Sequence, residues 1–213
     1  MFYYIYLHGF ASSPASFKAR EIARYFRDRN LTLHIPDLNQ GDFSHLTLTR
    51  QLQQVGQQIE ATSDPVYLIG SSLGGLTAAW LAEQYSQIER LVLLAPAFDF
   101  YPYWLSVLTH AERSQWQQEG YRSIYHYGER RSLPLHYNFI TDLLQYSRTG
   151  LTRTIPTLIV HGKQDETIPI QGSRDYAKVR SLVQLIELES DHGLGNCLPE
   201  ICTAIDSFFQ ISS

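Results

Sequence analysis

The feature that most constrains this chain is a Gly-x-Ser-x-Gly motif at residues 70–74, centred on Ser72, which directly follows a run of mostly β-forming residues at 65–69. Helix-forming residues continue from Leu76. A strand that turns sharply into a helix at such a motif lifts the central serine above the carboxyl end of the strand, and glycines are needed where side chains would clash. The stretch therefore predicts a nucleophile elbow that exposes Ser72.

The motif is short, so its meaning depends on its context. A chain of this length carries Gly-x-Ser-x-Gly by chance about once in fifteen to twenty cases at average glycine and serine usage. An ordinary βα turn rich in small residues is the alternative interpretation. The buried-strand pattern before Ser72 and the helix expected over 73–85 favour the elbow, because they are the arrangement that the chemistry requires.

Charge and composition argue against several classes of partner. The 213 residues include 17 Lys and Arg and 21 Asp and Glu, a net charge of −4 with neutral histidines, so no basic field indicates binding to nucleic acid or to an anionic membrane. The apolar run at 2–7 is too short for a signal segment or a membrane span, and we expect a cytoplasmic protein. Cys197 and Cys202 fit neither a disulfide framework nor a zinc spacing, and we expect both to be small buried hydrophobes.

Apolar strand patterns alternate with helix patterns along most of the chain, which is typical of βαβ units around a parallel sheet. We expect a single α/β domain over 1–213, with a doubly wound, mainly parallel sheet of six strands in the order 2-1-3-4-5-6. Ser13 and Pro14 favour the N-cap and the first position of the first helix. The expected strands are 2–7, 31–36, 65–69, 90–95, 157–161 and 183–188, and the expected helices are 14–29, 46–61, 73–85, 171–179 and 199–209.

One interval breaks this alternation. Residues 98–153 show no clean βαβ pattern, yet they are too long and too aromatic for a plain loop. We expect a helical insertion between the fourth and fifth strands, with a hairpin around 128–131. Because the insertion follows the carboxyl end of a strand, it should lie over the same sheet edge as Ser72, as a lid whose aromatic side chains form its own core or line a substrate pocket.

Candidates for an acid and a base follow the last two expected strands. Asp165 comes shortly after the fifth strand and His192 shortly after the sixth. The carboxyl ends of parallel strands build sites at one sheet edge, and the chain order Ser72, Asp165, His192 is the order expected after a nucleophile elbow. Asp99, which follows the fourth strand, is an alternative acid, although a strand, a turn and an acid fit the expected order better at Asp165.

A serine nucleophile also needs donors for an oxyanion. The backbone N–H of Leu73 lies in the first turn of the expected elbow helix, and the N–H of Phe10 follows the end of the first strand, next to where the elbow strand should pair. His8 and His161 also stand at strand ends. We expect them to organise loops, because the base must lie after the last strand.

Several of these stretches resemble a known superfamily. Residues 6–14, Tyr-Leu-His-Gly-Phe-Ala-Ser-Ser-Pro, and the elbow at 69–75 are similar to the corresponding parts of YqiA-type esterases, which are compact bacterial α/β-hydrolases. The stretches at 95–98, 161–162 and 191–192 look closer to bacterial acyl thioesterases and esterases of the same superfamily. The motifs that carry the resemblance span nearly the whole chain.

This resemblance implies an α/β-hydrolase fold and a role for each matching residue. Ser72 would be the nucleophile, His192 the base and Asp165 the acid, with Phe10 and Leu73 as oxyanion donors. The chain lacks the two leading antiparallel strands of fuller hydrolases, which leaves the oligomeric state open, a homodimer included.

The function we expect is hydrolysis of a small ester or thioester with a largely apolar acyl group, through an acyl-Ser72 intermediate. No metal or cofactor is expected, since the aspartates are isolated and no histidines cluster with ligand spacing. Phe98, Trp104 and Tyr137 of the insertion are the candidate substrate-binding residues. Two alternatives stay open: a receptor or scaffold without catalysis, and a triad enzyme that acts on a non-acyl bond, as in perhydrolysis or C–C hydrolysis.

Overall fold

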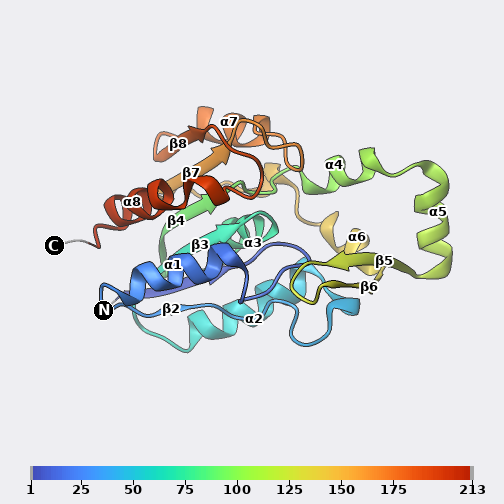
Figure 1. Ribbon diagram of the computed structural model, residues 1–213, viewed down its shortest axis with the longest axis horizontal. Helices are drawn as coiled ribbons and strands as arrows, with labels where there is room; N and C mark the ends of the chain where they lie inside the picture. Colours follow the sequence, from blue (N-terminus) through green and yellow to red (C-terminus); the bar gives the residue numbers. More distant parts are fainter. Residues whose placement is uncertain (1, 212–213) are drawn as a thin grey trace.

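The core of the molecule is a parallel sheet of six strands. A computed structural model describes residues 2–211, apart from the side chain of Tyr103. The strands are β1 Tyr3–Leu7, β2 Leu33–His34, β3 Val66–Ser71, β4 Ile88–Leu94, β7 Thr157–Gly162 and β8 Val183–Leu188. They lie in the order β2-β1-β3-β4-β7-β8, and all neighbouring pairs are parallel (Figure 1).

This order agrees with the expected one. The two strands of the insertion, β5 Tyr121–His126 and β6 Arg131–His136, pair only with each other and form a separate antiparallel hairpin. β7 and β8 are therefore the fifth and sixth strands of the main sheet, which restores the order 2-1-3-4-5-6.

Helices cover both faces of the sheet (Figure 1). On one face, α1 Phe17–Arg27 lies beside α8 Leu198–Phe209. The other face carries α2 Leu48–Glu60, α3 Leu73–Gln84 and α7 Gln171–Lys178. Among the helices that the structure describes, none is long and apolar enough to cross a membrane.

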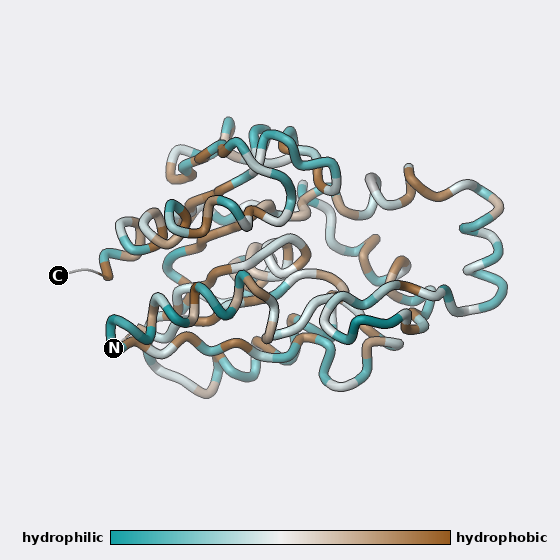
Figure 2. Tube along the Cα trace, in the orientation of Figure 1, coloured by the Kyte–Doolittle hydropathy of each residue, from teal (hydrophilic) through white to brown (hydrophobic). Residues whose placement is uncertain are grey.

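Successive residues of β1 point into two separate cores. Ile5 and Leu7 belong to the core under α2 and α3, whereas Tyr4 and Tyr6 belong to the core under α1 and α8. Because both faces are covered, the strand needs apolar or aromatic residues at every position, which explains the continuous run in the sequence. Figure 2 shows this as brown, hydrophobic strands inside and largely teal, hydrophilic stretches on the outer helices.

The insertion extends beyond the carboxyl ends of the strands (Figure 1). It contains α4 Phe100–Val107, α5 His110–Glu119, the β5–β6 hairpin and α6 Asn138–Leu143. Trp116 is at its centre, with its indole N–H donating to the Leu135 carbonyl at 3.0 Å. At the hairpin tip, the N–H of Tyr127 donates to the Ala11 carbonyl at 2.8 Å, which ties the insertion to the loop after β1.

Two expected elements are shorter than predicted by four residues or more, whereas the bounds of the others agree more closely. The first helix begins at Phe17 and not at Pro14, because residues 13–16 form a turn in which the Ser16 N–H donates to the Ser13 carbonyl. Ser16, not Ser13, is the N-cap, and its hydroxyl accepts from the Ala19 N–H. The second strand is only Leu33–His34, at the edge of the sheet, where it pairs on one side with β1.

The close approach of α3 to β1 predicts which glycine the fold needs. A methyl group at Gly74 would overlap the carbonyl oxygen of Leu7 and lie 2.6 Å from that of His8, whereas one at Gly195 would meet nothing within 4 Å. We expect Gly74→Ala to lower the free energy of unfolding by about 2–3 kcal/mol or to prevent folding. Gly195→Ala, the control, should stay within about 0.5 kcal/mol of the parent. Urea denaturation of both variants measures this, and equal stabilities would contradict the packing argument.

Candidate active site

Ser72 stands at the turn between β3 and α3, as the motif predicts. Its backbone has φ +55° and ψ −119°, a left-handed conformation that a residue with a side chain rarely adopts. Holding it costs about 1–3 kcal/mol, so the surroundings must fix it. The Ser72 N–H donates to the Leu94 carbonyl at 2.9 Å, and its carbonyl accepts from Gly75 and Leu76 of α3 at 2.9 and 3.2 Å. The strain is therefore held by β4 and by the first turn of α3.

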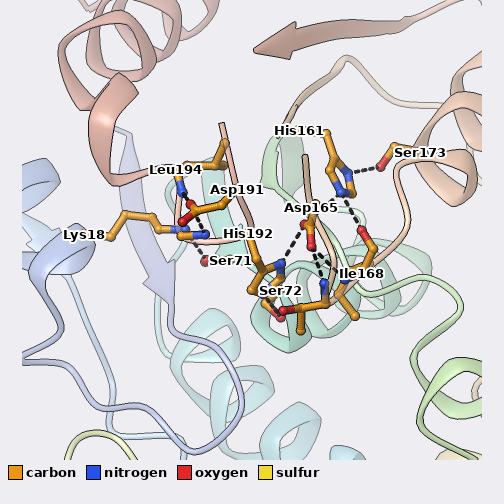
Figure 3. A network of polar contacts seen from close by, with 12 residues as sticks. Lys18, Ser71, Ser72, His161, Asp165, Ile168, Ser173, Asp191, His192 and Leu194 are labelled. Atoms are coloured by element: carbon orange, nitrogen blue, oxygen red, sulfur yellow. Dashed lines mark hydrogen bonds and ion pairs between the residues drawn. The ribbon is translucent and has the colours of Figure 1, made fainter. Parts of the chain in front are cut away.

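The three residues expected to act together are joined by hydrogen bonds (Figure 3). Nε2 of His192 lies 3.0 Å from Oγ of Ser72, and Nδ1 of His192 lies 2.7 Å from Oδ2 of Asp165. Because an ionised carboxylate only accepts, Nδ1 carries the proton toward Asp165 in neutral His192, and Nε2 is left to accept from the serine hydroxyl. The imidazole thus has the tautomer that a general base for Ser72 requires.

The carboxylate of Asp165 is fully buried, with 0 % of its side chain exposed. One oxygen accepts from the N–H groups of Thr167 and Ile168 at 2.9 and 2.7 Å, and the other faces both His161 and His192. Burial alone would raise the pKa of Asp165, but hydrogen bonds from the two histidines and the Ile168 N–H outweigh it and hold the pKa well below its usual range. Asp165 is therefore ionised at every pH at which His192 can act as a base.

His161 also contacts Asp165, which the sequence analysis did not predict. It is completely buried, and its Nε2 lies 3.1 Å from Asp165 Oδ2 and 3.0 Å from the Ile168 carbonyl, while Nδ1 lies 2.8 Å from Ser173 Oγ. It does organise a loop, as expected, but that loop is the one that carries the acid. The spacing of four residues between His161 and Asp165, at the end of a buried strand, is the signal that could have indicated the contact.

The alternative acid, Asp99, lies elsewhere. Its side chain is 45 % exposed and pairs with Arg148 at 3.4 Å, with no histidine contact among the described residues. The structure therefore brings Asp165, and not Asp99, to His192. His8 lies next to the elbow but structures a loop, as its Nε2 accepts from the Leu38 N–H at 3.0 Å.

Phe10 and Leu73 are the residues expected to supply oxyanion donors, and each follows a residue of the elbow region: Phe10 follows Gly9 and Leu73 follows Ser72. Within residues 2–211, no hydrogen bond from either group to a backbone or side-chain acceptor is found. Leu73 is the first residue of α3, where helical N–H groups have no intrahelical partner. The loop after β1 packs on the serine, because a methyl group at Gly9 would lie 3.3 Å from Ser72 Cβ. In the described part of the chain, neither N–H group is therefore used by the fold, and both belong to residues adjacent in the chain to Gly9 or Ser72.

The three candidate substrate-binding residues have different surroundings. Phe98 is buried and stacks on Tyr176, and it also lines a cavity of about 200 Å³ between α3 and the insertion. Trp104 contacts the ring of Phe10 edge-on, with centroids 5.3 Å apart. Tyr137 instead packs on Trp116, in the interior of the insertion. The residues lining the cavity are Leu76, Phe98, Asp99, Phe100, Tyr101, Pro102, Leu143, Leu144, Tyr146, Ser147 and Arg148.

Another cavity lies away from Ser72. A cavity of about 420 Å³ is lined by residues of β8 and α8 together with Arg90 and Pro156, at the amino ends of the strands and away from the serine. In the part of the chain that the structure describes, no three His, Cys, Asp or Glu side chains are grouped so that they could hold a metal ion.

Comparison with solved structures gives matches over nearly the whole chain. Alpha/beta hydrolase domain-containing protein 10 from mouse is 20 % identical, with a TM-score of 0.79, and the match covers 97 % of this chain and 88 % of that one. Est1E from Butyrivibrio proteoclasticus with ferulic acid bound is 19 % identical, with a TM-score of 0.81 and coverage of 97 % and 87 %. A monoacylglycerol lipase from Paleococcus ferrophilus is 16 % identical, with a TM-score of 0.77 and coverage of 99 % and 95 %.

These identities are low, so the likeness concerns the fold, which is that of the α/β-hydrolases. No curated protein matches the sequence. One family profile does, over residues 3–210, and its description is "Uncharacterised protein family (UPF0227)". Because that match covers nearly all of the chain, the protein belongs to the family UPF0227 and has the α/β-hydrolase fold that the resemblance to YqiA-type esterases implied.

Proposed function

We propose that this protein is a serine hydrolase that cleaves carboxylic ester or thioester bonds through an acyl-Ser72 intermediate. The observation that carries the proposal is the continuous hydrogen-bond chain from Ser72 Oγ through His192 to the buried Asp165. Such a chain activates a serine hydroxyl, which is a poor nucleophile by itself. Two proteins of the same fold are Est1E, with ferulic acid bound, and a monoacylglycerol lipase. Their names support ester chemistry for this site.

In the proposed mechanism, Nε2 of His192 takes the hydroxyl proton as Ser72 Oγ attacks the carbonyl carbon of the substrate. The negative charge that develops on the carbonyl oxygen is stabilised by the N–H groups of Phe10 and Leu73. Protonated His192 then gives its proton to the leaving alcohol or thiol, and the acyl group stays on Ser72. A water molecule, activated by the same histidine, releases the acid and restores the serine. Ionised Asp165 holds the imidazole in place and stabilises its protonated form.

The acyl group is proposed to bind in the cavity between α3 and the insertion. Leu76 lies one turn beyond Ser72 on α3, and Phe98 follows Ala97, whose N–H donates to the Ser72 carbonyl at 3.1 Å. Two residues that line the cavity are therefore close in the structure or the chain to the backbone of Ser72. Most of its lining residues are apolar or aromatic, and the one cation among them, Arg148, is already paired with Asp99 and Asp175. These features favour short to medium uncharged acyl groups.

Labelling of the serine tests the proposed nucleophile. A fluorophosphonate probe should add one label per chain, because Ser72 is paired with His192 at 3.0 Å. Ser72→Ala should take up no label, as measured by intact-protein mass spectrometry. The matched control is Ser86→Ala, which removes the hydroxyl of an exposed serine at the other end of the sheet and should still be labelled. A wild-type protein that stays unlabelled would favour a receptor or scaffold without catalysis.

The acid is tested by comparing two aspartates at the same sheet edge. Asp165→Asn leaves His192 without its ionised partner, and we expect kcat to fall by up to about 10⁴-fold. Asp99→Asn removes only a partly exposed ion pair with Arg148, and kcat should change by no more than a few-fold. Steady-state kinetics on a p-nitrophenyl ester measures both variants. If kcat falls strongly in Asp99→Asn but not in Asp165→Asn, the acid is Asp99 and not Asp165.

The acyl pocket is tested by a series of esters of graded chain length. Each buried methylene contributes about 0.8 kcal/mol, nearly fourfold in kcat/KM, until the cavity is full. We expect Phe98→Ala, which changes the wall of the cavity, to flatten this rise more than it lowers the rate on acetate esters. Trp104→Ala and Tyr137→Ala also remove aromatic rings, but these rings pack on Trp116 and do not line the cavity, so both should have the smaller effect. A profile unchanged in folded Phe98→Ala protein would place the acyl group elsewhere.

A further inference from the structure

Lys18 contacts the residue before Ser72, and the proposed mechanism assigns no role to its positive charge. It is the second residue of α1, where the helix dipole disfavours a positive charge. Its side chain is largely buried and crosses to the elbow, where Nζ donates to Ser71 Oγ at 3.1 Å (Figure 3). Helix stability alone does not account for a buried lysine at this position.

Two carboxylates attract the Lys18 ammonium from the other side. They belong to Asp165 and Asp191, the acid of the site and the residue before the base. Neither approaches closely enough for an ion pair, and within residues 2–211 the ammonium has no ion-pair partner. Burial lowers the pKa of Lys18 to about 8, although both carboxylates act in the opposite direction.

Asp191 shapes the turn that presents the base. Its Oδ1 accepts from the N–H groups of Gly193 and Leu194 at 2.9 and 3.2 Å, and Leu194 has a left-handed φ of +54°. His192 lies inside this turn. Lys18 thus interacts with both parts of the site. It donates a hydrogen bond to Ser71, the residue before the nucleophile, and its positive charge is attracted by Asp191, the residue before the base.

We propose that Lys18 is a positioning residue, whose ammonium joins the elbow to the His192 turn and keeps Ser72 Oγ and His192 Nε2 at hydrogen-bond distance. The proposal rests on the proposed serine hydrolase function and adds a second requirement to it. Activity needs the charged form of Lys18 as well as the neutral form of His192.

The charge of Lys18 acts among a small set of polar and titratable groups. They come from α1 itself, from β1, from the elbow and from the loops after β7 and β8. They are Glu21, which is paired with Arg24, then Tyr6, Ser71, Asp165 with His161 behind it, Asp191 and His192.

One effect on the pH profile follows from these surroundings. Above pH about 8, Lys18 loses its proton. The interactions of its side chain with Ser71 in the elbow and Asp191 in the His192 turn then weaken. The proposal therefore predicts that kcat/KM of the wild type declines above this pH.

The test uses Lys18→Met, Lys18→Arg and, as a control, Arg20→Met, which removes a positive charge from the exposed side of the same helix. Lys18→Met should lose between about tenfold and a hundredfold in kcat. Lys18→Arg, which stays charged at all working pH values, should restore much of kcat and remove the decline above pH 8. Arg20→Met should follow the wild type throughout.

The titration of Lys18 also gives a readout without catalysis. A lysine in an unfolded chain has a pKa near 10.4, so between pH 8 and 10 the unfolded state holds a proton that the folded state has lost. The urea midpoint of the wild type should therefore rise relative to that of Lys18→Met as the pH increases over this range. A difference that does not change with pH would show that the ammonium is not buried beside the site, and it would overturn the proposal.

The remaining outcomes separate this proposal from the proposed function. Suppose that the wild type reacts with the fluorophosphonate probe and that Lys18→Met has the same kcat and pH profile as Arg20→Met. This result would overturn the role of Lys18 but would not contradict the proposed hydrolase function. A wild type that does not react with the probe overturns both. A loss in Lys18→Met that Lys18→Arg does not restore also contradicts a role for the charge.

Discussion

The site depends on the close packing of α3 against β1 and β3. Gly74 lets the first turn of α3 lie directly on the Leu7 and His8 carbonyls, and this contact holds Ser72 in a conformation that an isolated turn would not keep. The position of the Ser72 hydroxyl and the strain of its backbone thus depend on one helix–strand interface.

A second constraint is the buried charge of Asp165. A carboxylate out of contact with water is costly unless its oxygens are hydrogen-bonded, and here four neighbouring residues do this: Thr167, Ile168, His161 and His192. Since two of these are backbone N–H groups of its own loop, the loop after β7 cannot rearrange without leaving the charge unsatisfied. Asp165 therefore stabilises the conformation of its own loop as well as the position of His192.

The catalytic candidates could be predicted because each follows an expected strand, and the parallel order of these strands brings their carboxyl ends together. Interactions across the tertiary structure could not be predicted. The start of α1 depends on a local turn at 13–16, and nothing in the sequence says that Lys18 points to Ser71 or that His161 touches Asp165. The insertion has no regular period, so the sequence could not separate Phe98, at a cavity, from Tyr137, in the interior of the insertion.

The hydrogen bond from the Tyr127 N–H to the Ala11 carbonyl has a mechanical consequence. Ala11 directly follows Phe10 and itself has a left-handed φ of +50°, so the backbone there has little freedom to absorb a shift. A hairpin that swings away from the sheet must either break this bond or pull the Phe10 peptide away from Ser72. A movement of the hairpin is therefore coupled to the position of Phe10, one of the two residues whose N–H groups are proposed to stabilise the oxyanion.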